Sequence, residues 1–202
     1  MIAVVDYGVG NLFSLACSLR HLGMESVVTR DADRLQRADR IILPGVGAFG
    51  DAMDKLTDTG LVPVLRKLTE NGKPLLGICL GMQLLFEKSF EYGEHAGLGL
   101  LRGQIRPLAG AVQGLKVPQM GWNSLHLVQP DDPLAANTRE GDYVYYVHSF
   151  YAADCEESLV ACSAYDVDVP GMVHAGCVYG TQFHPEKSGT VGLNILRAFG
   201  EV

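Results

Sequence analysis

Short apolar runs alternate with helix-period segments along the first half of the chain. The runs that predict strands are IAVVDYG (2–8), SVVTR (26–30), DRIILPG (39–45) and KPLLGI (73–78). The segments that predict helices are 11–23, 49–57, 61–71 and 80–89. Asn11 is the predicted N-cap of the first helix and Gly23 its stop signal. Alternation of this kind predicts a parallel sheet with helices on both faces.

The second half has a different pattern. From about Leu101, short strand-like segments are separated by Gly, Pro and Asp turns, which predicts antiparallel or mixed pairing. These segments are LKVPQM, DYVYYVHSF, SLVACSAY and GMVHAGCVYGTQFHP. A last amphipathic helix is predicted at about 189–199. Because no repeat or linker divides the chain, we expect one α/β domain over residues 1–202, with an antiparallel extension in its C-terminal half.

Composition and charge exclude several classes of function. The 202 residues are 48% hydrophobic and 19% charged, which is ordinary for a soluble globular protein. A net charge of −7 argues against general affinity for nucleic acid or anionic membrane, since either needs a basic face. No apolar run reaches membrane-spanning length, and the N-terminus lacks the basic region of a signal peptide.

The five cysteines indicate a reducing cellular compartment and do not indicate a disulfide framework. Their odd number and the absence of a CxxC pair argue against both a secreted disulfide scaffold and a zinc site. We therefore expect a cytoplasmic protein without a metal or a cofactor.

One cysteine stands at a position suited to chemistry. Cys79 lies between Gly77 and Gly81, where an apolar strand pattern meets a helix pattern, in the form of a nucleophile elbow. The glycines avoid steric clashes around a strained nucleophile. The helix N-terminus would favour a thiolate, and the N–H of Leu80 would point to a developing oxyanion. The simpler explanation is a small buried hydrophobic residue.

A histidine and a glutamate near the C-terminus offer a matching base. In TQFHPEKSG (181–189), His184 and Glu186 are two residues apart at the end of a strand pattern, so an extended chain would direct both to one face. Glu186 would hold one ring nitrogen and leave the other to accept the thiol proton. The simpler explanation is a surface histidine beside Pro185. We expect the remaining histidines to be structural.

The glycine-rich stretch PGVGAFG (44–50) has two interpretations beyond a plain tight turn. Its Gly45, Gly47 and Gly50 match the dinucleotide-binding fingerprint, but they follow the third strand rather than the first, and Glu70 falls near a helix end. Alternatively, the backbone N–H groups of this loop approach a ligand beside Cys79 and supply a second oxyanion donor.

Taken together, these motifs resemble the class I (triad) glutamine amidotransferases, whose three-layer α/β fold we then expect. The resemblance narrows to the glutaminase subunits of imidazole glycerol phosphate synthase and covers essentially the whole chain. The stretches that carry it are DYGVGNL (6–12), PGVGAFGDAM (44–53), GICLGMQ (77–83), GLGLLRG (97–103), PQMGWN (118–123), YYVHSFY (145–151) and FHPEKS (183–188). Gln119, where the family has His, and Phe150, where Tyr is common, depart from the pattern.

The resemblance implies a set of roles. Cys79, His184 and Glu186 would form the catalytic triad that hydrolyses L-glutamine through a glutamyl thioester. The oxyanion hole would consist of the Leu80 N–H and the Gly45–Gly47 loop, with Val46 as the donor. Glutamine would be bound by Gln83, Glu91, Ser149 and Phe150. For Gln83 and Glu91 the simpler explanations are an exposed helix residue and a solvated acid.

The resemblance also implies a partner. Ammonia made for synthesis would pass to a separate (β/α)₈-barrel cyclase, which makes imidazole glycerol phosphate and an aminoimidazole carboxamide ribotide in histidine biosynthesis. The candidate residues for this heterodimer interface are Asn11, Trp122, Asn123, Tyr145 and Lys187. Trp122 is the only tryptophan, and its alternative location is the core.

Four alternatives remain open at this point. The first is a stand-alone cysteine hydrolase of γ-glutamyl bonds, and the second is a glutaminase that serves another synthase. The third is a dinucleotide-dependent oxidoreductase built on residues 45–50, and the fourth is a non-catalytic interaction subunit.

Overall fold

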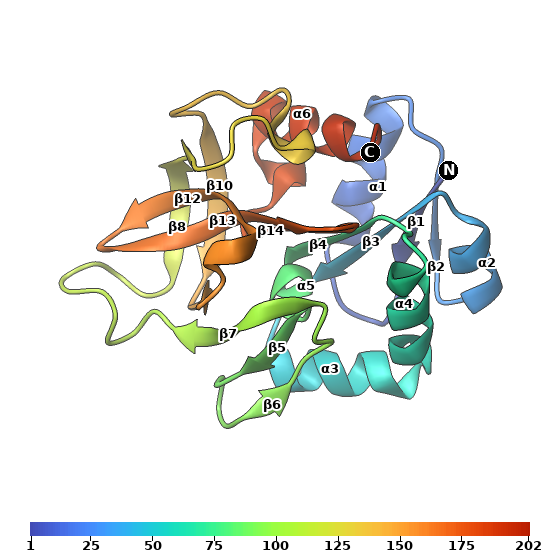
Figure 1. Cartoon of the computed structure of the whole chain (residues 1–202), viewed down its shortest axis with the longest axis horizontal. Coiled ribbons are helices and arrows are strands. Elements are labelled where there is room, and N and C mark those ends of the chain that lie inside the picture. Colours follow the sequence, from blue (N-terminus) through green and yellow to red (C-terminus); the bar gives the residue numbers. More distant parts are fainter.

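The computed structural model describes all 202 residues and has the predicted parallel sheet at its centre (Figure 1). Five neighbouring strands are parallel, and three more continue the same sheet in antiparallel pairing. In spatial order the strands are β2 (Ser26–Thr29), β1 (Ile2–Val5), β3 (Arg40–Gly45), β4 (Leu75–Cys79), β14 (Val178–Thr181), β13 (Val167–Ala175), β12 (Leu159–Tyr165) and β9 (His126–Leu127). The predicted fold class, a mostly parallel sheet with an antiparallel C-terminal extension, is confirmed.

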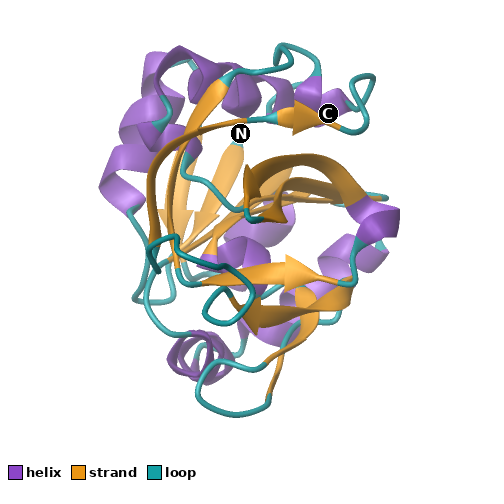
Figure 2. Cartoon of the chain, turned by 90° about the vertical axis from the view of Figure 1, so that its left-hand side faces the viewer, coloured by secondary structure: helices purple, strands orange, loops and turns teal.

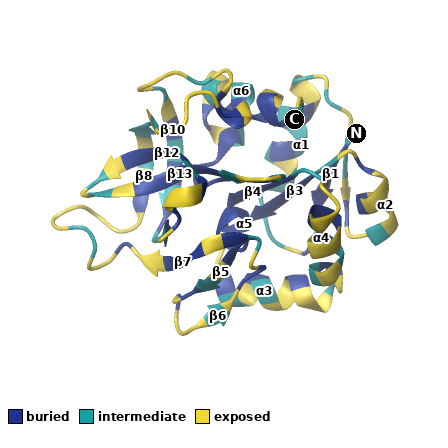
Figure 3. Ribbon diagram, viewed as in Figure 1, coloured by how far each residue is buried: buried dark blue, intermediate teal, exposed yellow.

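Helices cover both faces of this sheet and complete a three-layer architecture (Figures 1 and 3). One face is covered by α1 (Leu12–His21) and α6 (Gly189–Phe199), and the other by α2 (Ala32–Arg37), α3 (Phe49–Asp58), α4 (Leu61–Glu70) and α5 (Leu80–Gln83). The two buried clusters follow the alternation of strand side chains: Val4 packs with the first helix pair and Val5 with the second set. No helix has the length and apolar character needed to cross a membrane.

Two smaller sheets flank the central one (Figure 2). A two-stranded ribbon pairs β8 (Gln119–Ser124) with β10 (Tyr143–His148), and a four-stranded sheet contains β11 (Phe150–Ala153), β7 (Leu101–Pro107), β5 (Phe86–Ser89) and β6 (His95–Ala96). Three 3₁₀ turns complete the chain: η1 (Pro133–Ala135), η2 (Glu156–Ser158) and η3 (Pro185–Lys187).

The helix predicted at 80–89 is wrong beyond its first turn. Helix α5 ends at Gln83, and Phe86–Ser89 forms β5, which pairs with β7. Residues 80–86 are all buried, so the segment has no solvent face to sustain an amphipathic helix, and strand pairing decides its conformation. The six-residue helix α2, which the sequence pattern did not predict, begins at Ala32, and the carboxylate of its N-cap residue Asp31 accepts the N–H of Asp33.

Glycines allow β3, β4 and α5 to approach each other backbone to backbone. A Cβ atom on Gly81 would lie 1.9 Å from the carbonyl oxygen of Leu43, and one on Gly77 would lie 2.6 Å from the carbonyl oxygen of Gly81. Both distances are far below van der Waals contact. The steric reason given for glycine on either side of Cys79 therefore holds in the structure.

We expect Gly81→Ala to lower the free energy of unfolding by about 3 kcal/mol or more, at the upper end of overpacking effects, because backbone atoms cannot move aside as side chains can. The measurement is equilibrium denaturation in urea. Gly72→Ala is the control, since a Cβ atom on Gly72 meets nothing within 4 Å; its positive φ (+83°), which Gly81 does not have, should cost only about 1–2 kcal/mol. Equal losses for the two variants would contradict the steric explanation.

Candidate active site

Cys79 lies where three parallel strands end together. It is the last residue of β4, it pairs with Gly45 of β3, and β14 runs along its other side. Its backbone has φ 55° and ψ −113°, which is strained for a residue with a side chain. Carboxyl ends of parallel strands are where ligands bind in sheets of this type. The conformation and the position both distinguish Cys79 from an ordinary buried thiol.

His184 and Glu186 make the contact that their spacing predicted, but by a different route. The Nδ1 atom of His184 lies 2.9 Å from Oε1 of Glu186, and both side chains are 3% exposed. The prediction assumed an extended chain, whereas residues 185–187 form the turn η3 after β14 has ended. Pro185 at the first position of η3 has the φ that such a turn requires.

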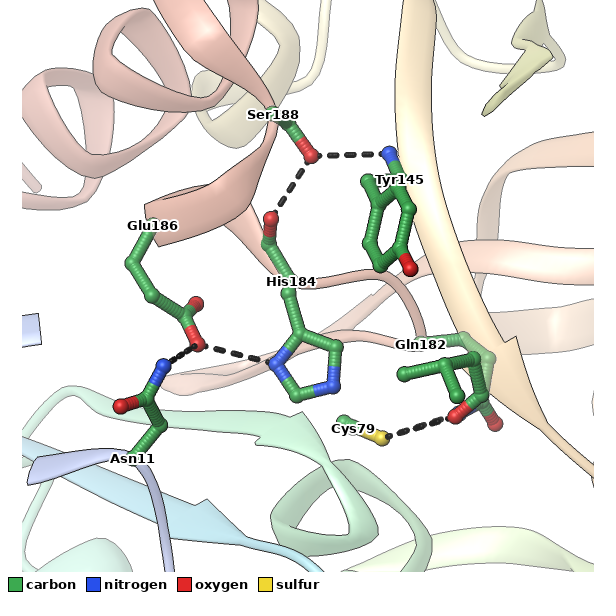
Figure 4. A network of polar contacts seen from close by, with 8 residues as sticks. Asn11, Cys79, Tyr145, Gln182, His184, Glu186 and Ser188 are labelled. Carbon is green, nitrogen blue, oxygen red and sulfur yellow. Dashed lines mark hydrogen bonds and ion pairs between the residues drawn. The ribbon is translucent and has the colours of Figure 1, made fainter. Parts of the chain in front are cut away.

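The imidazole of His184 bonds to Glu186 on one side and faces the Cys79 sulfur on the other (Figure 4). Burial acts to lower the pKa of His184, but hydrogen bonds to Cys79 and to Glu186 outweigh it and raise that pKa to about 9. The ring therefore holds a proton at neutral pH, beside the Cys79 sulfur.

Further contacts hold His184 and Glu186 in place. The Oγ atom of Ser188 donates to the carbonyl oxygen of His184 at 2.7 Å and accepts the N–H of Tyr145 at 3.0 Å. The side-chain amide of Asn11 reaches Oε1 of Glu186 at 3.5 Å. Asn11 stands at the N-cap position of α1, as predicted, but makes no capping hydrogen bond, because its side chain is turned towards the triad.

A cleft of about 320 Å³ opens above Cys79, which is a suitable size for a small molecule. Its wall contains most of the residues predicted to form the oxyanion hole or to bind glutamine. They are Val46, Gly47, Leu80, Gln83, Glu91, Ser149 and Phe150. Gly45 is the exception, since it is buried behind the cleft, where a Cβ atom would lie 2.7 Å from the amide nitrogen of Gly81.

The glycine-rich loop is not built to bind a dinucleotide. In such a site the pyrophosphate lies against a free helix N-terminus after the loop. Here the helix after the loop is α3, and the N–H of Phe49 at its start donates to Oε2 of Glu91 at 2.6 Å. A carboxylate already occupies that position and would repel a phosphate. Burial raises the pKa of Glu91, against the opposing effect of the Phe49 N–H.

Gln83 is buried and does not lie on an exposed helix surface. Its Nε2 atom donates to the carbonyl oxygen of Phe150 at 2.9 Å and to Oε1 of Gln182 at 2.9 Å. With both N–H groups used, only its carbonyl oxygen remains for a ligand in the cleft.

Two residues of the site were not predicted. His148 was expected to be structural, but it lines the cleft, and its Nδ1 atom donates to the carbonyl oxygen of Phe150 at 2.8 Å. Burial, reinforced by the charge of His184, lowers the pKa of His148 to about 4, so the ring is neutral. Gln182 is completely buried beside Cys79. Its only signal in the sequence is its place two residues before His184.

The chain has no group of three or more His, Cys, Asp or Glu side chains arranged to hold a metal ion. All five cysteines are free thiols.

Glu186→Gln should lower the turnover of a reaction at Cys79 by about 10²- to 10⁴-fold, because the amide neither stabilises the imidazolium nor selects the same tautomer. Since Glu186 helps to raise the pKa of His184 to about 9, its loss lowers that pKa. The alkaline limb of the pH–rate profile, where the imidazolium loses its proton, should therefore move to lower pH. A profile with an unmoved alkaline limb would contradict this role; Glu201→Gln, at the exposed C-terminal end, is the control.

Comparison with known proteins gives a family. The family model described as "Glutamine amidotransferase class-I" matches residues 3–201. The chain is 52% identical over 203 residues to imidazole glycerol phosphate synthase subunit HisH of Geobacillus kaustophilus, covering 98% of this chain and 95% of that protein. It is 46% identical to the subunit of the same name from Listeria monocytogenes, covering 100% and 96% of the two chains.

Solved structures agree with this family in fold. A crystal structure of a glutamine amidotransferase superposes with a TM-score of 0.77 at 22% identity and covers 100% of this chain and 98% of that one. The structure of PurLQS from Thermotoga maritima gives a TM-score of 0.76 at 22% identity, with 99% and 97% covered. The full-length match at about half identity and the shared fold together show that the chain belongs to the class-I glutamine amidotransferase family, among the HisH subunits of imidazole glycerol phosphate synthase.

Proposed function

We propose that this chain hydrolyses L-glutamine and delivers the ammonia to a separate cyclase subunit in imidazole glycerol phosphate synthase, an enzyme of histidine biosynthesis in the cytoplasm. One observation supports the hydrolysis of glutamine. The Cys79 sulfur, the His184 imidazole and the Glu186 carboxylate lie next to one another in this order, beginning with the sulfur in the wall of the cleft. The HisH relatives, matched over nearly their full length, support the biosynthetic part.

The first half-reaction forms a thioester and releases ammonia. The Cys79 thiolate attacks the side-chain amide carbon of glutamine, and the oxygen becomes an oxyanion held by backbone N–H groups of Leu80 and of the 45–47 loop, with Val46 as the loop donor. The imidazolium of His184 then gives its proton to the departing nitrogen. The carbon–nitrogen bond breaks, ammonia leaves, and a γ-glutamyl thioester remains on Cys79.

The second half-reaction restores the enzyme. Neutral His184 takes a proton from water, and the resulting hydroxide attacks the thioester carbon. The carbon–sulfur bond breaks, glutamate leaves, and the thiolate again faces an imidazolium. Glu186 keeps the same ring nitrogen occupied throughout, so the other nitrogen can carry the proton in both directions.

Substrate recognition rests on groups of opposite polarity in the cleft wall. The ammonium of the glutamine donates hydrogen bonds to two acceptors in the wall. One is the free carbonyl oxygen of Gln83, and the other is the Glu91 carboxylate oxygen that does not accept the N–H of Phe49. The backbone N–H groups of Ser149 and Phe150 bind its carboxylate. The exposed Val46 and Gly47 at the cleft mouth are free to adjust around the bound amide.

An exposed aromatic face beside the cleft is suited to the cyclase. Strand alternation puts Trp122 and Tyr145 on one side of the β8–β10 ribbon, with ring centroids 5.9 Å apart, and Trp122 is 55% exposed rather than part of the core. Tyr145 also accepts the N–H of His184 through its carbonyl oxygen. This face is therefore attached directly to the catalytic base, and Lys187 is exposed. Asn123, the neighbour of Trp122 on β8, points to the other side of the ribbon and donates to the carbonyl oxygen of Ala164.

Asn11 differs from the other interface candidates. Because its amide is engaged with Glu186, we assign it to holding the triad in this chain, and contact with a partner would have to break or share that hydrogen bond.

The function is tested by assaying the chain with a purified (β/α)₈-barrel cyclase and the substrate of that cyclase. We expect glutamine-dependent product formation, its loss in Cys79→Ala by more than about 10⁴-fold, and unchanged synthesis when ammonium salt replaces glutamine. The ammonium arm shows that the variant complex is still folded. Rapid glutaminase activity without the cyclase would instead favour a stand-alone hydrolase of γ-glutamyl bonds, and product with a different synthase would favour another pathway.

Trp122→Ala should weaken cyclase binding by at least about 30-fold, since buried tryptophans at interface centres are worth about 2 kcal/mol or more. The measurement is a titration of glutaminase activity with cyclase, with isothermal calorimetry as a second readout. Val28→Ala, an exposed apolar residue on β2 at the opposite edge of the sheet, is the control and should bind normally. Unchanged affinity in Trp122→Ala would exclude this face from the interface.

A further inference from the structure

Gln182 stands directly beside the nucleophile, although neither the triad nor the predicted substrate site includes it. Strand β14 pairs with β4 in a register that matches Thr181 with Ile78. One step further along this register, Gln182 is opposite Cys79, and opposite residues of parallel neighbours share a face. The Nε2 atom of Gln182 lies 3.8 Å from the Cys79 sulfur, and the side chain is 0% exposed. Figure 4 shows both Gln182 and His184 near this sulfur.

A backbone carbonyl fixes which end of the Gln182 amide faces the sulfur. The carbonyl oxygen of Phe150 can only accept, so the side-chain group of Gln83 that contacts it at 2.9 Å must be the nitrogen. The second hydrogen of the same nitrogen points to Gln182, which must present its carbonyl oxygen there, again at 2.9 Å. The remaining end of the Gln182 amide is therefore its N–H₂ group, and it faces the sulfur.

An N–H donor at this position matters because, apart from the His184 imidazolium, support for a thiolate is limited. Helix α5 has four residues, so its dipole is small compared with that of a long helix. Besides Gln182 and His184, the carbonyl oxygen of Val147 lies near the sulfur, at 3.9 Å; it is an acceptor and favours the protonated thiol. A donated hydrogen bond stabilises the charged form of its acceptor.

Two titratable side chains face Cys79 from other elements. His184 contacts the sulfur from the segment after β14, and Tyr7, beyond the end of β1, is near enough for the sulfur charge to contribute to its raised pKa, after the larger effect of burial. The hydroxyl of Tyr7 donates to the carbonyl oxygen of Pro44 and is not available to the sulfur. His184 is therefore a charged donor to the sulfur, and Gln182 adds a neutral N–H donor at 3.8 Å.

We propose that Gln182 is a positioning residue that stabilises the Cys79 thiolate by an N–H···S hydrogen bond. Through Gln83 it also links the sulfur to Phe150, whose backbone N–H would bind the substrate carboxylate. This inference rests on the proposed glutaminase function. The nucleophile and the substrate-binding segment are then held by one hydrogen-bonded chain, in which each amide orients the next and His148 secures the far end.

Two substitutions separate the two halves of this role. Gln182→Glu keeps an oxygen for Gln83 but replaces the donor beside the sulfur with a carboxylate oxygen. Gln182→Met removes both contacts at nearly constant volume. Gln119→Met is the matched control, since Gln119 is also a buried glutamine, on β8, but its amide has no hydrogen-bond partner.

The first readout is the rate of alkylation of Cys79 by iodoacetamide between pH 5 and pH 10, followed by mass spectrometry of the peptide that contains Cys79. We expect the midpoint of this profile to rise by about one pH unit or more in Gln182→Glu and Gln182→Met, which is tenfold in the thiol–thiolate equilibrium. Gln119→Met should retain the wild-type midpoint. A purely structural role would lower thermal stability and leave every midpoint unchanged.

The second readout is glutaminase kinetics in the complex with the cyclase. Gln182→Glu should lower kcat about tenfold or more and change KM less than about threefold, because Gln83 keeps its partners. Gln182→Met should lower kcat and also raise KM, because Gln83 is released. Identical alkylation profiles for Gln182→Glu and wild type would overturn the proposal. If wild type has no glutaminase activity, the proposed function fails, while the alkylation profiles still decide the role of Gln182.

Discussion

The site depends on the backbone-to-backbone contact between the end of β3 and the turn that follows β4. The carbonyl oxygen of Leu43 lies where a side chain on Gly81 would have to be, and a side chain on Gly45 would meet the amide nitrogen of the same glycine. This contact fixes the path of the chain through Cys79 and forces its positive φ. It also sets the glycine-rich loop against the nucleophile. Strained residues persist only where their surroundings over-determine them, and here two neighbouring strands do so.

The second constraint is electrostatic. An imidazole this deeply buried would ordinarily lose its proton, because burial disfavours the charged form. His184 keeps it, since a carboxylate on one side and a sulfur on the other together outweigh the cost of burial. His148, buried nearby without such partners, shows the opposite result, with a pKa of about 4. Two histidines in one cleft thus differ in charge because of their neighbours alone: His184 is protonated and His148 is a neutral hydrogen-bond donor.

The sequence predicted secondary structure best where the local pattern agrees with the tertiary packing. Strands β1 to β4 and helices α1, α3, α4 and α6 were predicted, because buried runs and amphipathic periods are local signals. Strand β14 lies in a segment for which antiparallel or mixed pairing was predicted, and it is parallel to β4. Helix α5 was predicted too long, since an amphipathic pattern does not reveal that β7 pairs with Phe86–Ser89. The contact of His184 with Glu186 was predicted from the wrong geometry, because a turn can replace an extended chain at the same spacing. Gln182 was missed, because its role depends on the register between β14 and β4.

That register explains why the late part of the chain must enter the middle of the sheet. Strand β14 is separated from β4 by about a hundred residues, yet it lies between β4 and the antiparallel extension. Only a strand adjacent and parallel to β4 can end at the same edge as Cys79. The residues that follow its end then bring Gln182 beside the sulfur and His184 into the cleft. The intervening segments then enclose the cleft: β10 contacts the base through Tyr145, and Phe150 at the start of β11 anchors the amide chain. The nucleophile is therefore complete only after the last strand has joined the sheet, so a partly folded chain would expose a cysteine that has neither its base nor its hydrogen-bond donor.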